Sequence, residues 1–125
     1  MALTPQARSL LGLALLVLAA LAAQAWWTAR LRADVGADVA ALARAGDIHM
    51  LSSDSCGICD QARQWFVTHR VPYTECSIER DSACRAAFDA RLAPGTPVLL
   101  VRGRVLLGFS PERLRAALAA SGVGG

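Results

Sequence analysis

The sequence predicts one α/β domain in the order β-α-β-α-β-β-α, behind a single N-terminal hydrophobic helix. Two observations support this fold class. Residues 10–27 are almost entirely apolar, and residues 47–121 alternate between short strand-like apolar runs and longer segments with a helical period. A chain of 125 residues has room for one such domain and an appendage. The predicted organisation is an N-terminal tail (1–8), an anchor or signal segment (9–28), a helical linker (29–46), the domain (47–121) and a flexible tail (122–125).

The apolar segment runs from Leu10 to Trp27, with Gln24 as its only polar side chain. As an α-helix it would rise about 27 Å, enough to cross the apolar layer of a membrane. We favour a retained single-pass anchor, because the apolar run continues through two tryptophans that suit a membrane interface. A cleaved signal peptide is the alternative, with Ala23-Gln24-Ala25 as its cleavage signal.

Charge gives little information about orientation or nucleic-acid binding. Arg8 precedes the apolar segment and Arg30, Arg32 and Arg44 follow it, so the positive-inside rule does not decide the topology. The N-terminal segment resembles a signal sequence, and the small chain has four cysteines. Both features favour an extracytoplasmic, for example periplasmic, location for the domain. The thirteen basic residues, all arginines, are scattered and have no interleaved aromatic platform. We therefore expect no nucleic-acid partner.

The linker at 29–46 carries apolar residues at helical spacing, namely Leu31, Val35, Val39 and Leu42. This pattern predicts a helix that continues from the membrane segment and stops near Gly46.

Cys56 and Cys59 lie where a strand-like run gives way to a helix-like one. The polar break Ser52–Ser55 before them is typical of a strand end and a helix cap. A helical face follows, made of Ile58, Ala62, Trp65, Phe66 and His69. A helix N-terminus favours a thiolate at Cys56, with Cys59 one turn further in. A Cys-x-x-Cys pair beside a β-α-β pattern is typical of a thioredoxin-like redox site.

The spacing of the cysteines and the residue after Cys59 argue against a zinc site and a haem attachment. A zinc site would need a second close pair of ligands, whereas Cys76 and Cys84 are eight positions apart, so no metal site is predicted. A c-type haem attachment would need histidine after the second cysteine, where this chain has Asp60. A purely structural Cys56–Cys59 bridge remains an alternative. Cys76 and Cys84 form either a second disulfide or two reduced core thiols.

The sequence after the Cys56–Cys59 helix predicts two more helices and three more strands. Residues 73–78 are expected to form a strand, with Cys76 and Ile78 on one face. Asp81 is the expected N-cap of a helix from Ser82 to about Leu92, with Cys84, Phe88 and Leu92 on one stripe. Residues 98–101 and 104–107 form a hairpin about Arg102-Gly103. Ser110 and Pro111 begin the last helix.

The block from 47 to 120 resembles a glutaredoxin. The resemblance rests on Cys56 to Cys59, Val71-Pro72-Tyr73 before the second strand, Gly95-Thr96-Pro97-Val98, and Gly108-Phe109-Ser110 before the last helix. It implies a thioredoxin-like fold in which Pro97 is a cis-proline facing the active site. It also implies a substrate or glutathione groove formed by Thr96, Pro97, Val98, Gly108, Phe109 and Ser110.

Three departures from the family pattern bear on glutathione. Gly57-Ile58 stands between the cysteines where glutaredoxins commonly have Pro-Tyr, and Ser53 lies near the place of a lysine. Pro94-Gly95 stands where glutaredoxins have a basic or amide residue just before their Thr-Val-Pro segment. Because the missing groups would pair with glutathione carboxylates, we expect weaker glutathione binding than is usual in the family.

The sequence thus predicts an enzyme, a membrane-tethered thiol–disulfide oxidoreductase acting through Cys56 and Cys59. Its expected partners are protein or glutathione disulfides and the membrane, through residues 9–28. No bound cofactor is expected, and glutathione is a candidate reductant. Two alternatives remain: a non-catalytic binding module for a membrane partner, and a carrier that binds Cu(I) with the same cysteines.

Overall fold

A computed structural model describes residues 2–121, so the predicted flexible tail at 122–125 lies outside the described residues. The chain divides between Asp34 and Val35 into two compact units, which are described separately. The first unit consists of one helix with its short lead-in, and the second contains the sheet.

The first unit is formed by most of α1 (Pro5–Leu42). The helix begins inside the predicted tail because Thr4 caps it: the N–H of Ala7 donates to Thr4 Oγ1 at 3.3 Å. Pro5 occupies the first helical position, which tolerates proline. No breaker separates the apolar segment from the linker, so the helix continues from one into the other as predicted, but it ends at Leu42 rather than near Gly46. Its apolar window is fully exposed, and α1 is long and apolar enough to cross a membrane.

The second unit contains a four-stranded sheet in the order β2-β1-β3-β4. The strands are β1 (Ile48–Ser52), β2 (Thr74–Ser77), β3 (Val98–Val101) and β4 (Arg104–Leu107). β1 and β2 are parallel, whereas β3 is antiparallel to both of its neighbours. The helices are α2 (Gly57–Thr68), α3 (Ser82–Ala90) and α4 (Pro111–Ser121). The predicted order β-α-β-α-β-β-α and the mixed α/β class are confirmed.

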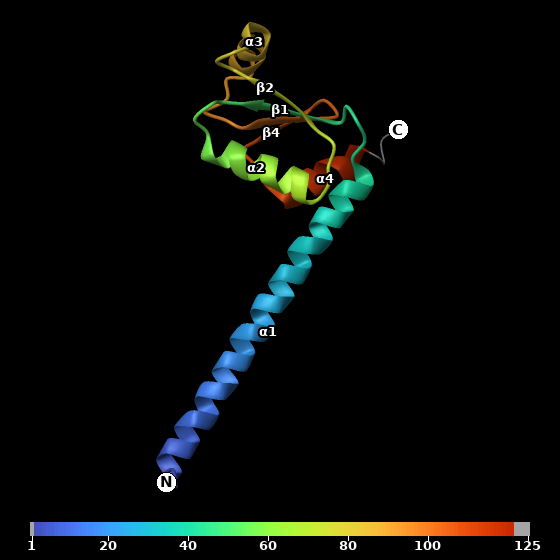
Figure 1. The fold of residues 1–125 in the computed structure, drawn as a ribbon. Coiled ribbons are helices and arrows are strands. Elements are labelled where there is room, and N and C mark those ends of the chain that lie inside the picture. The colour runs from blue at the N-terminus through green and yellow to red at the C-terminus, as the bar shows by residue number, and fades with distance from the viewer. Residues whose placement is uncertain (1, 122–125) are drawn as a thin grey trace. The chain divides into compact units, whose positions relative to one another are not determined.

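Helices cover both faces of this sheet. Figure 1 shows α2 and α4 on one face and α3 on the other. The larger hydrophobic cluster joins the sheet to α2, α4 and the end of α1 through Val35, Val39, Ile48, Met50, Ala62, Phe66, Leu99, Val101, Leu114 and Leu118. The smaller one, under α3, has Leu51, Cys84 and Val98 as its buried members. The α3 face therefore has much less apolar packing than the α2 face.

The compact unit begins at Val35, earlier than the domain boundary predicted at residue 47. Val39 is fully buried in the larger cluster, so the last turns of α1 are part of the domain core. Gly36 permits this packing, since a Cβ atom at that position would collide with the imidazole ring of His69 at the end of α2. The linker predicted at 29–46 is thus partly a core element.

Two predicted apolar positions are wrong. Ile58 is 50% exposed, because the buried stripe of α2 runs through Cys59, Ala62 and Phe66 instead. Leu92 is 90% exposed, because α3 ends at Ala90 and Leu92 follows in the left-handed region with φ 51°. Ile58 thus lies in the first turn of its helix, outside the buried stripe, and Leu92 lies beyond the end of its helix.

Candidate active site

The strand ends that border the candidate site meet at one edge of the sheet. The register pairs Leu51 of β1 with Val98 of β3, and Val98 with Leu107 of β4. Because both pairs are antiparallel, the end of β1, the start of β3 and the end of β4 lie at the same edge. β2 runs parallel to β1 and ends there too. Residues that follow or precede these ends are therefore brought close together.

Cys56 comes shortly after β1, Pro97 directly before β3, and Gly108 directly after β4. The backbone N–H of Gly108 donates to the carbonyl oxygen of Pro97 at 2.9 Å, which ties the last two segments together. The Thr96–Pro97 peptide bond is cis, as the resemblance to glutaredoxins implied. Gly108 has φ 78°, a conformation that strongly favours glycine and lets the chain turn at this edge.

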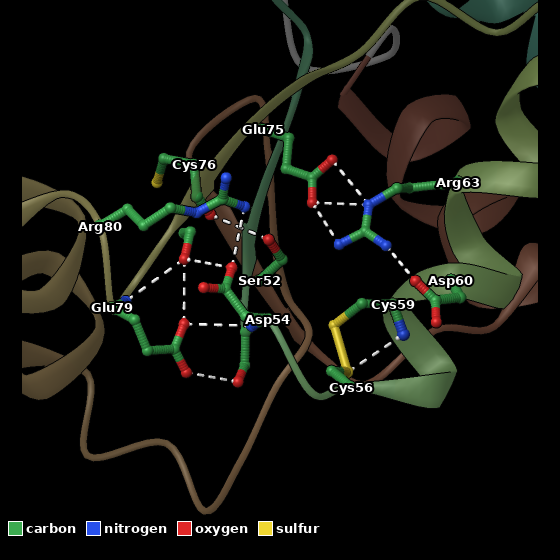
Figure 2. Close-up of polar contacts among 12 residues, drawn as sticks. Ser52, Asp54, Cys56, Cys59, Asp60, Arg63, Glu75, Cys76, Glu79 and Arg80 are labelled. Atoms are coloured by element: carbon green, nitrogen blue, oxygen red, sulfur yellow. Dashed lines mark hydrogen bonds and ion pairs between the residues drawn. A yellow bond between two sulfur atoms is a disulfide. The ribbon is translucent and has the colours of Figure 1, made fainter.

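Cys56 and Cys59 form a disulfide at the start of α2, with their Cα atoms 5.2 Å apart. Cys56 is the N-cap residue, and its Sγ accepts a hydrogen bond from the backbone N–H of Cys59 at 3.1 Å (Figure 2). Cys56 is half-buried, whereas Cys59 is completely buried. The two sulfurs therefore differ both in access and in hydrogen bonding.

This arrangement suits thiol–disulfide exchange. After reduction, a thiolate at Cys56 would retain the N–H of Cys59 and would lie at the positive end of the α2 dipole. An incoming disulfide can approach Cys56, which is half-buried, but not Cys59, which is completely buried. Cys59 is in turn placed to attack a mixed disulfide on Cys56, since the two already form a bond.

Residues 48–106 match the glutaredoxin family model. A solved structure, that of a mutant of the thioredoxin-like protein BC3987, superposes with a TM-score of 0.53 and 24% sequence identity, covering 59% of this chain and 96% of that one. The domain of this chain has the thioredoxin fold and is similar to glutaredoxins. The glutaredoxin of Archaeoglobus fulgidus is also similar, with a TM-score of 0.48 and 14% identity over 58% of this chain and 85% of that one. No curated protein matches the chain.

An arginine lies between two carboxylates beside the Cys56–Cys59 disulfide. Arg63 lies one turn after Cys59 and pairs with both Asp60 and Glu75, its Nε donating to the two Glu75 oxygens at 2.9 and 2.8 Å. Burial would raise the pKa of Glu75, but the hydrogen bonds from Arg63 and Ser52 and the charges of Arg63 and Arg80 together outweigh it and leave that pKa below its ordinary value. The hydrogen bond to Glu75 likewise raises the pKa of Arg63. Arg63 thus places one positive charge between the two carboxylates of Asp60 and Glu75.

A second polar cluster holds the loop that leads to Cys56. Asp54 pairs with Arg80 at 2.8 Å and accepts a hydrogen bond from Ser77 at 3.0 Å. Glu79 accepts from the Ser53 hydroxyl at 2.6 Å, from Ser77 at 2.9 Å and from the Asp54 N–H at 3.1 Å. These hydrogen bonds lower the pKa of Glu79 to about 2, and the bond from Ser53 has the largest effect. The cluster ties the loop after β1 to the turn after β2 (Figure 2).

The residues expected to form a substrate groove differ in what their side chains contact. Val98 is buried under α3, and the ring of Phe109 packs 5.6 Å from the rings of both Trp65 and Phe66. Ser110 caps α4, accepting from the Arg113 N–H at 3.3 Å. Thr96 is half-buried. Binding of substrate by these residues stays a prediction, and for Val98 and Phe109 the structure shows a packing role.

Sequence reasoning missed the arginines of this region. Along the sequence Arg63, Arg80 and Arg113 look like scattered charges, yet Arg63 and Arg80 form ion pairs with carboxylates near Cys56 and Cys59. Arg113 donates to the Leu107 carbonyl at 2.9 Å, at the same sheet edge. The spacing of four between Cys59 and Arg63 was the one signal available, since it places both on one side of a helix.

Proposed function

We propose that this chain is a membrane-tethered thiol–disulfide oxidoreductase that acts through Cys56 and Cys59. The single observation that supports this function best is the asymmetry of the pair. Cys56 is accessible at the N-terminus of α2 and accepts an N–H, whereas Cys59 is enclosed behind it. A bridge with only a structural role has no need of an exposed sulfur at a helix N-terminus.

The proposed reaction starts from the dithiol. The Cys56 thiolate attacks one sulfur of a substrate disulfide, forming a mixed disulfide and releasing the first substrate thiolate. Cys59 then attacks the Cys56 sulfur, its proton passes to the departing second thiolate, and the Cys56–Cys59 disulfide forms. The substrate gains two electrons and the protein loses two. Two molecules of an external thiol, with glutathione as the candidate, return the pair to the dithiol through a mixed disulfide and leave joined as their own disulfide.

The expected substrates are protein or glutathione disulfides. The cis Thr96–Pro97 segment and the Gly108 turn lie at the same sheet edge as Cys56, which supports an extended substrate held there. For glutathione, the start of α4 and nearby backbone N–H groups offer partners to a carboxylate. Weak binding is expected, because the basic groups that the family places near this edge are absent from positions 53 and 95.

Tethering is proposed for α1, whose apolar window is exposed and long enough to span a bilayer. Sodium carbonate extraction should leave the full chain in the membrane pellet. A mature protein that begins at Trp26 would instead show that the segment is a cleaved signal peptide.

The activity is tested by turnover of a protein disulfide with glutathione and glutathione reductase as the electron supply. The wild-type chain should turn over, whereas Cys56→Ser should reduce the rate to background. Ser82→Ala, an exposed change on α3, is the control and should behave as wild type. A wild-type rate no higher than that of Cys56→Ser would favour a non-catalytic binding module. Stoichiometric copper in anaerobically purified protein would favour a Cu(I) carrier.

A further inference from the structure

The second disulfide, Cys76–Cys84, lies on the sheet face that carries α3. It joins β2 to the first turn of α3, with the two Cα atoms 6.0 Å apart. This face has a small core, with Leu51, Cys84 and Val98 as the buried members of its cluster. The bridge therefore ties α3 to the sheet where apolar packing alone is limited.

The two sulfur-bearing residues of this bridge are not equivalent. Cys84 is only 3% exposed, whereas Cys76 is half-buried. Cys76 also lines a pocket of about 690 Å³ together with Ser77, Arg80 and Asp81. An external thiolate attacks the disulfide sulfur that it can reach, so access favours Cys76. The Cys56–Cys59 pair has the same asymmetry, with one half-buried and one enclosed cysteine.

An imidazole lies against the more accessible sulfur. His49 Nε2 is 3.3 Å from Cys76 Sγ, although the residues are 27 positions apart. The other ring nitrogen, Nδ1, is 2.7 Å from Thr74 Oγ1, which is itself 3.4 Å from the Ile48 carbonyl oxygen. If the Thr74 hydroxyl donates to Nδ1, Nε2 carries the hydrogen. If it donates to Ile48, both nitrogens of an imidazolium can donate, one to Thr74 and one to Cys76.

We propose that Cys76 and Cys84 form a second exchangeable couple, in which Cys76 is the reactive sulfur and His49 stabilises its thiolate. The reductant is an external dithiol. Its thiolate attacks Cys76 Sγ, the Cys76–Cys84 bond breaks, and Cys84 leaves and takes up a proton. The second sulfur of the dithiol then attacks the first, and Cys76 departs as a thiolate beside His49. The dithiol becomes a disulfide and the protein gains two electrons.

The test uses the full chain in detergent micelles with Cys56→Ser and Cys59→Ser, so that its outcome is independent of the proposed oxidoreductase activity. The protein is equilibrated with graded ratios of reduced to oxidised dithiothreitol, its thiols are blocked, and the reduced fraction is measured by mass. Half-reduction of His49→Ala should require a ratio of reduced to oxidised dithiothreitol about tenfold higher than the protein with His49 requires. This difference is equivalent to a reduction potential lower by about 30 mV for a two-electron couple. In the reduced protein, alkylation of Cys76 should also be slower in His49→Ala than in the protein with His49.

Two further variants keep this test decisive. His49→Gln preserves volume and an N–H donor but cannot become an imidazolium, and it should shift the ratio in the same direction as His49→Ala. His69→Ala removes the chain's other histidine, which contacts Trp65 on the opposite face, and should leave the ratio unchanged. An unchanged ratio in both His49 variants would overturn the proposal. So would reduction of the bond only in denaturant, which would make it a structural disulfide.

Discussion

The backbone N–H of Cys59 donates a hydrogen bond to Sγ of Cys56 at 3.1 Å. Because Cys56 is the N-cap of α2, its sulfur takes the place that a serine or aspartate oxygen usually fills at a helix N-terminus. A negative sulfur gains more from this position than a neutral one, since the N–H groups and the helix dipole favour anions. The same hydrogen bond therefore caps the helix and prepares the proposed nucleophile.

Replacing Arg63 with alanine should destabilise the domain by about 1 to 2 kcal/mol, because Glu75 would keep its charge in a largely enclosed position without its partner. The comparison is urea unfolding of the full chain in detergent. Arg85→Ala is the matched control, since Arg85 pairs with Asp89 on the exposed surface of α3 and should cost less than about 0.5 kcal/mol. Equal losses for the two variants would contradict the role given to Arg63.

Val39→Ala should also destabilise the domain, by about 2 kcal/mol, because Val39 is completely buried against the sheet domain. Val17→Ala makes the same chemical change in the exposed part of α1 and should leave the unfolding of the domain unaltered. Thermal unfolding followed by tryptophan fluorescence measures both. If Val39→Ala unfolds like Val17→Ala, the core does not include the end of α1.

Local patterns in the sequence were sufficient for the order of the elements and for the position of Cys56 and Cys59 at the start of a helix. Apolar periods, Ser110-Pro111 and the Arg102-Gly103 turn are short-range signals, and the structure contains each predicted helix and strand of the domain. The helix predicted from the apolar spacing of Val35 and Val39 is also confirmed. The spacing could not reveal which surface this helical stripe packs against, because its burial depends on residues far away in the chain.

The errors and omissions have the same physical origin. Ile58 and Leu92 fit a helical period, but each lies at or beyond a helix end where the core no longer covers it. The pairing of Arg63 with Glu75 joins residues 12 positions apart, and that of His49 with Cys76 joins residues 27 apart. Such contacts are decided by strand register and helix packing, which no local pattern specifies.

Glu79→Gln should lower thermal stability at pH 7 and have no effect near pH 2. The pKa of Glu79 is lowered from 4.5 to about 2 in the folded protein, so its carboxylate stabilises the fold above about pH 4.5. This stabilisation is lost as the pH falls from about 4.5 through about 2, because the carboxylate then becomes protonated in both states. Melting curves of wild type and variant should therefore converge over this range. A difference that stays constant down to pH 2 would contradict the hydrogen-bonded role of the carboxylate.

The two cysteines of the active pair should behave differently when one is replaced. Cys59→Ser removes the resolving sulfur, so a mixed disulfide with substrate should accumulate on Cys56 and be visible on a non-reducing gel. Cys56→Ser should neither turn over nor trap substrate, because Cys59 is completely buried. Trapping by Cys56→Ser at the rate of Cys59→Ser would show that the enclosed sulfur is the nucleophile.

The most direct test of the assigned roles is site-resolved alkylation of the reduced wild-type chain. Brief exposure to iodoacetamide at pH 6, followed by peptide mass spectrometry, measures the rate at each cysteine. Cys56 should react at least ten times faster than Cys59, because its thiolate is favoured by the Cys59 N–H and the start of α2 and its sulfur is accessible. Faster alkylation of Cys59 would contradict the mechanism and reverse the two roles.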